Sequence, residues 1–326
     1  MTARPISVIV CTYNRADLLA GLLRQLRVQD YPTDAFEIVV IDNCSNDHTK
    51  QVVERFVTEA GVPVQYVVEG HLGISFVRNR GAQAARYPFL AYIDDDCSVG
   101  PDWLSQLAKG FDLQDDVDVV GGRVLLAWDQ KQKPAWLGTE LEPWLGADNR
   151  PGSQPRVLGK EMRVREGNMA LTWEAWHSCG GFLGMEQFGS KNMAAGEVIY
   201  LLNQVERRRG KVVFVPGAVA HHHVTKQGCP WFLRRAYWQG VSDGILDYLL
   251  HRRSGISILG RILFDLIVLF GLFCYAGVSC LKADRAKAVF HLLRAIRRFG
   301  LILSETRLVG DWPLAKLWVL GVHLEP

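Results

Sequence analysis

Three consecutive aspartates, Asp94, Asp95 and Asp96, are the residues whose type and spacing point most directly to chemistry. They follow an apolar run over residues 88–93, where a strand is expected to end and where folding alone requires no such cluster. Adjacent carboxylates repel one another strongly once they are partly desolvated, and a divalent cation removes that repulsion. The triplet therefore predicts a metal site, and the alternative is a solvated acidic turn that caps the next helix.

A second unusual cluster consists of three consecutive histidines, His221, His222 and His223, after a strand-like stretch over residues 211–215. Neutral imidazole is a common ligand for borderline metals. Side chains alternate in an extended segment, so His221 and His223 should face away from His222. The cluster predicts a metal or phosphate ligand, with a solvated loop as the alternative. A dedicated zinc site is disfavoured because no second ligand pair has suitable spacing.

Strand-like and helix-like segments alternate through the first hundred residues. The strand-like segments lie at residues 6–11, 36–41, 62–68 and 88–93, and the helix-like segments at residues 16–28, 46–60 and about 75–86. The strands are continuous apolar runs, whereas the helical segments repeat their apolar residues at helical spacing. This pattern predicts an α/β fold with a mainly parallel, Rossmann-like sheet that is covered by helices on both faces.

Polar side chains follow three of these strands at the point where each strand ends. They are Thr12, Tyr13, Asn14 and Arg15 after the first strand, Asp42 after the second, and the aspartate triplet after the fourth. Ligands of such sheets bind beyond the carboxyl ends of the strands, so these side chains should line one rim. Asp42 is suited to accept from a base N–H or a ribose hydroxyl, and Asn14 and Arg15 are suited to a diphosphate.

Two common nucleotide motifs are missing from the sequence. No Gly-x-Gly-x-x-Gly follows the first strand, and there is no Gly-x-x-x-x-Gly-Lys, which disfavours dinucleotide and P-loop sites. An acidic metal site fits a nucleoside diphosphate better, because the cation bridges the phosphates and stabilises the departing one.

Composition narrows the class of protein. The 326 residues are 48% hydrophobic and 22% charged, with a formal net charge of +3, which is typical of a globular chain and argues against a nucleic-acid partner. The seven cysteines are scattered and never spaced Cys-x-x-Cys, so neither a disulfide framework nor a zinc site is indicated. The N-terminus lacks a signal-peptide pattern, and we expect a cytoplasmic protein.

Four segments, in order, resemble the motifs of family 2 glycosyltransferases. Residues 7–15 read Ser-Val-Ile-Val-Cys-Thr-Tyr-Asn-Arg, residues 37–47 read Glu-Ile-Val-Val-Ile-Asp-Asn-Cys-Ser-Asn-Asp, residues 78–81 read Arg-Asn-Arg-Gly, and residues 92–96 read Tyr-Ile-Asp-Asp-Asp. The similarity continues through residues 166–170, 180–182 and 216–224. Each segment alone is weak, but their order and spacing are specific.

The resemblance implies a nucleotide-diphospho-sugar fold of the glycosyltransferase A type and inversion at the anomeric carbon by direct displacement. Asp42 would contact the nucleobase, and Arg78 would lie near the nucleotide or diphosphate. Asp94 and Asp96 would form the Asp-x-Asp motif, with Asp96 a direct ligand of Mn²⁺ or Mg²⁺ and Asp95 orienting the loop or donor. Family spacing after Pro216 favours His222 as the histidine ligand.

The resemblance also bears on the acceptor side. The segment with Asn168 is similar to one that meets the donor sugar or the acceptor. An inverting transfer needs a base for the acceptor hydroxyl, and Glu197 is the candidate, with Glu186 in reserve. The family pattern has an acidic pair before the following helix, whereas this chain has one acid, displaced by one or two residues. The alternative is that Glu197 is a first-turn carboxylate favoured by the helix dipole.

The last third of the chain changes character. Residues 262–281 contain a single charge, Asp265, and meet the length criterion for a transmembrane helix. One span after a cytosolic catalytic domain would place the following lysines and arginines outside, against the positive-inside rule, so a buried, re-entrant or interfacial helix competes. Residues 286–299 suit a basic amphipathic helix on an anionic membrane, or a surface helix packed on the domain.

We therefore predict a catalytic domain over residues 1–228, with a nucleotide-binding half (1–125) and an acceptor half (126–228), and a helical, membrane-associated region over residues 229–326. The predicted activity is metal-dependent, inverting transfer from an NDP-sugar, such as a UDP-sugar, to a saccharide or lipid-linked hydroxyl acceptor. Cell-surface or exported polysaccharide synthesis at the inner face of the cell membrane is the expected setting. The alternatives are a sugar-phosphate nucleotidyltransferase and a noncatalytic sugar-nucleotide-binding or membrane scaffold subunit.

Overall fold

A computed structural model describes residues 3–128, 133–134, 136–159, 163–184, 196–224, 228–251, 255–281 and 285–309. The chain divides into two compact units. The first comprises residues 1–133, 142–187 and 197–225, and the second comprises residues 134–141, 188–196 and 226–326. The domain boundary that we predicted at residue 228 stays a prediction, because compactness alone does not show that either unit folds by itself.

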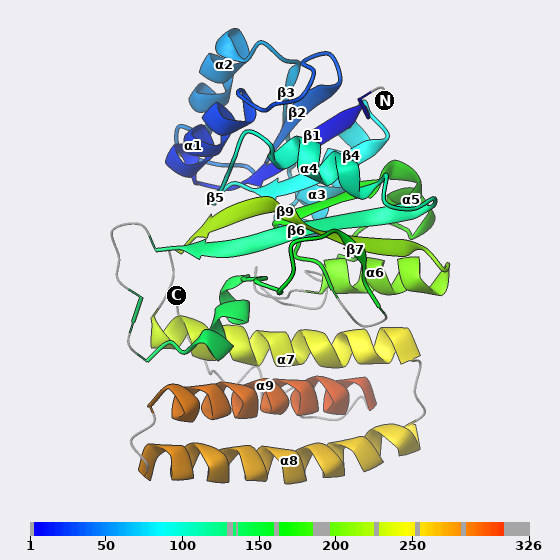
Figure 1. Ribbon diagram of the computed structural model, residues 1–326. Helices are drawn as coiled ribbons and strands as arrows, with labels where there is room; N and C mark the ends of the chain where they lie inside the picture. The colour runs from blue at the N-terminus through cyan, green and yellow to red at the C-terminus, as the bar shows by residue number, and fades with distance from the viewer. Residues whose placement is uncertain are drawn as a thin grey trace. The chain divides into compact units, whose positions relative to one another are not determined.

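One sheet organises the first unit, as Figure 1 shows. Its strands are β1 (Ile6–Thr12), β2 (Phe36–Asp42), β3 (Val64–Val68), β4 (Phe89–Asp94), β5 (Cys97–Val99), β6 (Val117–Ala127), β7 (Arg156–Val157), β8 (Asn168–Thr172) and β9 (Lys211–His223). Their order is β3-β2-β1-β4-β8-β6-β9-β5, and β7 pairs with β9. The first four strands pair in parallel, whereas β8 runs antiparallel to both β4 and β6. The predicted α/β fold with a mainly parallel sheet is confirmed.

Helices cover both faces of this sheet. They are α1 (Ala16–Leu26), α2 (Thr49–Glu59), α3 (Ile74–Ala84), α4 (Trp103–Gly110), α5 (Trp173–Ser178) and α6 (Glu197–Arg207). A 3-10 helix, η1 (Thr139–Leu145), is divided between the two units. Alternate residues of one strand serve the two faces. Val8 and Val10 pack in the core with α1 and α2, whereas Ile9 packs in the core with α3 and α6.

Three helices make up the described C-terminal part of the second unit: α7 (Cys229–His251), α8 (Gly255–Leu281) and α9 (Arg285–Val309). Helix α9 packs against both α7 and α8 and lies between them (Figure 1). Leu293 and Ala295 of α9 are fully buried. Of the positions with apolar spacing in residues 286–299, Leu293 is buried and Phe299 is 47% exposed. Helix α9 therefore packs on protein over part of its apolar side, and its contact with a membrane stays a prediction.

No helix in the described ranges combines the length and apolar character that crossing a membrane requires.

Glycines let α7 and α9 approach closely. A Cβ atom at Gly240 would collide with the carbonyl oxygen of Arg297, and one at Gly300 would collide with that of Tyr237. We expect Gly240→Ala to lower the free energy of unfolding by about 1–3 kcal/mol, because backbone atoms cannot make room. The matched control is Gly271→Ala in α8, where a Cβ meets nothing within 4 Å; it should be neutral or stabilise by about 1 kcal/mol. Thermal and urea unfolding measure both, and equal effects would contradict the close packing.

Candidate active site

The parallel register brings the predicted strand ends together. Thr12 of β1 lies beside Asp42 of β2, and Cys11 lies beside Asp94 of β4. Three polar clusters that are about thirty to fifty residues apart in the sequence therefore share one rim of the sheet, as the strand-end rule predicts.

Asp42 lies at the β2 end of the rim and is almost completely buried. Its Oδ1 accepts from the backbone N–H of Ser45 at 2.9 Å, and its Oδ2 accepts from the Tyr66 hydroxyl at 2.5 Å. Burial first, and then this contact with Asp42, raise the pKa of Tyr66. Sequence analysis did not identify Tyr66, because no pattern in the β3 sequence indicates a hydrogen bond to Asp42 on β2.

Asn14 joins the loops that follow β1 and β2. Its backbone N–H donates to Ser45 Oγ and its Oδ1 accepts from the N–H of Asn46, both at 2.8 Å. Its φ of 51° lies in the left-handed region, which asparagine tolerates better than most residues. Asp47 accepts from the N–H groups of Ala16 and Thr49, the first residues of α1 and α2, and so ties the starts of the two helices to one carboxylate. Tyr13, in the same loop, is 44% exposed.

Arg15 lies against the aspartate triplet. Its Nη1 donates to Asp95 Oδ1 and to Asp96 Oδ2, each at 2.7 Å. Burial raises the pKa of Asp95 to about 6, against the lowering effect of Arg15. We predicted a positive charge beside these carboxylates, and in this structure the guanidinium of Arg15 provides one.

His222 meets the triplet from β9. Its Nε2 lies 3.5 Å from Asp96 Oδ2, and its Nδ1 lies 2.7 Å from the Leu145 carbonyl oxygen. A carbonyl only accepts, so Nδ1 must carry the proton. Burial lowers the pKa of His222, but the hydrogen bond and charge of Asp96 outweigh it and the pKa is raised. His223 contacts Ser98 instead, at 3.0 Å, and His221 is exposed.

The carboxylates of the aspartate triplet and the His222 imidazole suit a hard or borderline cation. Ligands that share one Mg²⁺ at about 2.1 Å stand about 3 Å apart in octahedral geometry, so Asp96 Oδ2 and His222 Nε2, 3.5 Å apart, would have to approach by about half an ångström to share one. The Nδ1 contact to Leu145 fixes the ring so that Nε2 presents its lone pair when the imidazole is neutral. In the described part of the chain, no group of three or more His, Cys, Asp or Glu side chains is arranged to hold a metal alone. Mg²⁺ sites are often completed by substrate phosphates.

Glu197 is the first residue of α6, and the structure buries it. Arg78 Nη1 donates to Glu197 Oε1, and each side chain of this ion pair is only 4% exposed. Arg78 Nη2 also lies 3.6 Å from Asp94 Oδ1, and the Arg78 carbonyl accepts from the Tyr92 hydroxyl at 3.0 Å. Burial lowers the pKa of Arg78, but Glu197 and Asp94 outweigh it and the pKa is raised. Glu197 therefore stands as a neutralised carboxylate. Glu186, the reserve candidate, lies outside the described residues.

Asn168 requires a correction to its predicted ligand contact. Its side chain is fully buried. Its Oδ1 accepts from Trp103 Nε1 at 2.8 Å, and its Nδ2 donates to the carbonyls of Arg123 and Ala218 at 2.9 and 2.8 Å. Both amide N–H donors and the oxygen are thus used by the protein, and Asn168 supports the start of β8 from within.

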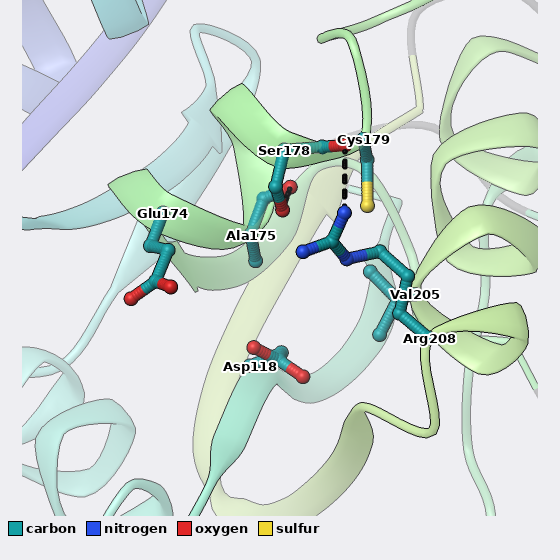
Figure 2. Close-up of a pocket in the computed structure, with 7 residues that line it drawn as sticks. All are labelled: Asp118, Glu174, Ala175, Ser178, Cys179, Val205 and Arg208. Carbon is teal, nitrogen blue, oxygen red and sulfur yellow. Dashed lines mark hydrogen bonds between the residues drawn. The ribbon is translucent and has the colours of Figure 1, made fainter.

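A small pocket elsewhere in the first unit contains none of the predicted residues (Figure 2). Asp118, Glu174, Ala175, Ser178, Cys179, Val205 and Arg208 line it. Arg208 Nη1 donates to the Ser178 carbonyl at 3.2 Å, and burial raises the pKa of Asp118. The pocket lies between α5, the end of α6 and the start of β6, away from the strand ends that carry the rim.

Comparisons with known proteins identify the family and the fold. The sequence model of Glycosyl transferase family 2 matches residues 7–180. A glucosyl-dolichyl phosphate glucuronosyltransferase of Haloferax volcanii is 26% identical over 255 residues, which are 76% of this chain and 79% of the relative. The succinoglycan biosynthesis protein ExoM of Rhizobium meliloti is 26% identical over 244 residues, 74% of each chain.

Among solved structures, a mannosyltransferase from Pyrobaculum calidifontis in complex with GDP-Man and Mn²⁺ matches with a TM-score of 0.54. The match covers 99% of this chain and 82% of that one, at 19% identity. At this identity the likeness establishes the fold.

Proposed function

The chain belongs to Glycosyl transferase family 2, and from this premise we propose that it transfers a sugar from an NDP-sugar, such as a UDP-sugar, to a hydroxyl acceptor with inversion. The enzyme is a glycosyltransferase. The observation that carries the finer proposal is the single rim shared by Asp42, Arg15 and the Asp96–His222 pair. Along this rim, the nucleobase would lie at Asp42 and the diphosphate at Asp96.

The residues proposed to hold Mn²⁺ or Mg²⁺ are Asp96 and His222, with Asp94 beside them. When bound, the cation would supply positive charge that stabilises the departing diphosphate. Arg15 bridges Asp95 and Asp96 in this structure. We propose that it turns toward the donor phosphates, since a guanidinium binds phosphate oxygens in the same bidentate way as carboxylates. Thr12, Tyr13 and Asn14 would form the wall of this donor site.

Glu197 is proposed as the base that deprotonates the acceptor hydroxyl, and its ion pair sets a condition on that role. A carboxylate held by a buried guanidinium is a weak base, because taking up a proton would leave the guanidinium unpaired. We propose that Arg78 exchanges Glu197 for the donor diphosphate. Glu197 then regains its basicity only when a donor is in place, which would limit wasteful proton transfer without one.

The proposed acceptor is a saccharide or lipid-linked hydroxyl, in the synthesis of a cell-surface or exported polysaccharide. One relative is named for a dolichyl phosphate glycan and another for succinoglycan synthesis, which supports this class. We propose that the enzyme works at the cytoplasmic face of the cell membrane, with the membrane surface as a partner.

Metal removal tests the proposal. The purified full chain, supplied with Mn²⁺ and a panel of UDP- and GDP-sugars, should release nucleoside diphosphate from at least one donor, and EDTA should reduce that rate by at least about 100-fold. Added Mn²⁺ or Mg²⁺ should restore it. Nucleotide binding without turnover of any donor would overturn the proposed donor class, and full activity in EDTA would overturn the metal.

A further inference from the structure

Helix α8 presents two chemically different sides. Asp265 and Leu272 are buried, at 1% and 8% exposure, and Asp265 pairs with Arg298 of α9 at 3.1 Å. This side therefore packs against α9, which carries the partner of the one charge in residues 262–281.

The other side of α8 is an exposed apolar stripe. It consists of Leu266, Ile267, Phe270, Phe273 and Cys274. Ile267 and Phe270 are 72% and 73% exposed. At about 100° per residue these five positions fall on one side of the helix, and none of them is charged. Large side chains exposed together in this way mark a surface that meets another apolar phase.

Charge identifies the partner of this surface. Residues 229–309 contain twelve lysines and arginines against five aspartates and glutamates, although the whole chain carries only +3. Lys287 and Arg294, on the neighbouring α9, are exposed. A second copy of the chain would bring the same positive charge to the contact, whereas an anionic lipid surface complements it. Each lysine or arginine near such a surface contributes about 1 kcal/mol.

We infer that the α8 stripe inserts into the interface of an anionic phospholipid bilayer, with α8 lying in the membrane plane. The inference rests on the proposed function in one respect, because the bilayer surface is where a lipid-linked acceptor would be held. It selects the interfacial alternative for residues 262–281 and assigns the lipid contact to α8, because α9 packs against both α7 and α8. Apolar faces of such helices bury about 5–10 Å deep, at the boundary of headgroups and acyl chains.

Vesicle flotation of the full chain tests the inference. Wild type should float with vesicles of phosphatidylcholine containing phosphatidylglycerol, and much less with phosphatidylcholine alone. The double variant Ile267→Asp/Phe270→Asp should lose at least about tenfold in partitioning, since it replaces inserted apolar area by charge. The matched control is Val57→Asp, at a 48% exposed position of α2, which should float like wild type. Unchanged flotation of the double variant would overturn the inference.

Thiol alkylation gives a second readout without any substitution. Cys274 lies on the stripe and Cys44 lies in the loop after β2, and both thiols are free and exposed. With anionic vesicles, peptide mass spectrometry should show slower alkylation of Cys274 and an unchanged rate at Cys44. Equal rates with and without vesicles at both cysteines would overturn the inference.

Two further outcomes would assign the stripe to protein instead. A wild-type dimer that the double variant converts to monomer, without lipid binding by either, would make a second copy the occupant. A large fall in the melting temperature of the double variant would show that protein already covers the stripe.

Donor turnover in detergent-free solution separates this inference from the proposed function. If the wild-type chain turns over a donor but does not bind anionic vesicles, only the inference is overturned. If the wild-type chain binds the vesicles but turns over no donor, only the proposed function is overturned.

Discussion

Asp96→Ala is expected to abolish metal-dependent nucleotide binding. Asp96 Oδ2 is shared between Arg15 at 2.7 Å and His222 at 3.5 Å, so the substitution removes the atom on which the proposed cation and its histidine ligand converge. We expect the affinity for UDP in the presence of Mn²⁺ to fall at least about 100-fold, since even outer-shell changes cost 10–100-fold. Isothermal titration of Mn²⁺ and UDP measures this.

Thermal stability offers an independent readout of the same substitution. A ligand at 100 times its Kd stabilises the folded state by about 2.7 kcal/mol, so Mn²⁺ and UDP together should raise the melting temperature of wild type. Arg15 retains Asp95 at 2.7 Å when Asp96 is lost, and the fold should survive. Asp96→Ala should melt at the same temperature with and without the ligands.

A histidine pair supplies the matched control for the metal site. His222→Ala should reduce the Mn²⁺ effect strongly, whereas His221→Ala, at the exposed neighbouring position, should leave it unchanged. If Asp96→Ala keeps the full ligand-induced shift in melting temperature, Asp96 is not a metal ligand. If His221→Ala matches His222→Ala, the placement of His222 is wrong.

The rim was predictable because its causes are local in the sequence. Apolar runs that end in polar residues predicted β1, β2 and β4, and parallel pairing then requires their carboxyl ends to meet. The parallel registers of Thr12 with Asp42 and of Cys11 with Asp94 agree with that argument. No knowledge of the tertiary packing was needed to bring these side chains to one edge.

The contacts across the rim depend on packing that no local pattern encodes. Arg78 and Glu197 are 119 residues apart, and their pairing requires α3 and the start of α6 to lie on the same face of the sheet. The contacts of Asn168 are equally hard to predict, because its amide forms hydrogen bonds with Trp103, Arg123 and Ala218, which lie in three different parts of the chain. Sequence analysis selected Arg78, Glu197 and Asn168 as site residues. It expected Asn168 to contact the donor or the acceptor, whereas in the structure the Asn168 amide is bonded to other residues of the protein.

In the C-terminal helices, too, the sequence predicted the elements but not what each apolar side packs against. Amphipathic spacing in residues 286–299 predicted a helix with one apolar side, of which Leu293 is buried and Phe299 is exposed, but the spacing could not tell lipid from protein as the partner of that side. Leu293 and Ala295 are buried, whereas Ile267 and Phe270 of the more apolar α8 are exposed. Hydrophobicity therefore identified the helices that bury apolar surface. Which side of α8 stays exposed is determined by the packing of α9 between α7 and α8.

Glu197→Gln is expected to lower kcat by about 100- to 10,000-fold, the usual contribution of a general base, while the donor binds as tightly as to wild type or more tightly, because an uncharged glutamine competes less for Arg78. Glutamine keeps an oxygen that can accept from Arg78, so the contact survives although the charge is lost. The matched control is Glu174→Gln, at an exposed position of α5, which should retain wild-type turnover. Stopped-flow transfer at saturating donor, with a separate binding titration, measures the two effects.

A purely structural role for Glu197 makes a different prediction for transfer, and a paired substitution measures what the ion pair contributes to stability. Removing one partner of a buried ion pair costs about 3–5 kcal/mol, whereas replacing both partners by apolar residues is often neutral or stabilising. Arg78→Met/Glu197→Leu should therefore be more stable to unfolding than Arg78→Met alone. Arg78 belongs to the proposed donor site, so the role of Glu197 is read from Glu197→Gln, which keeps Arg78. If Glu197 only holds Arg78 in place, Glu197→Gln should retain transfer at saturating donor, because the glutamine oxygen still accepts from Arg78. If Glu197 takes the acceptor proton, Glu197→Gln should stay folded and lose transfer, because no carboxylate remains to receive the proton.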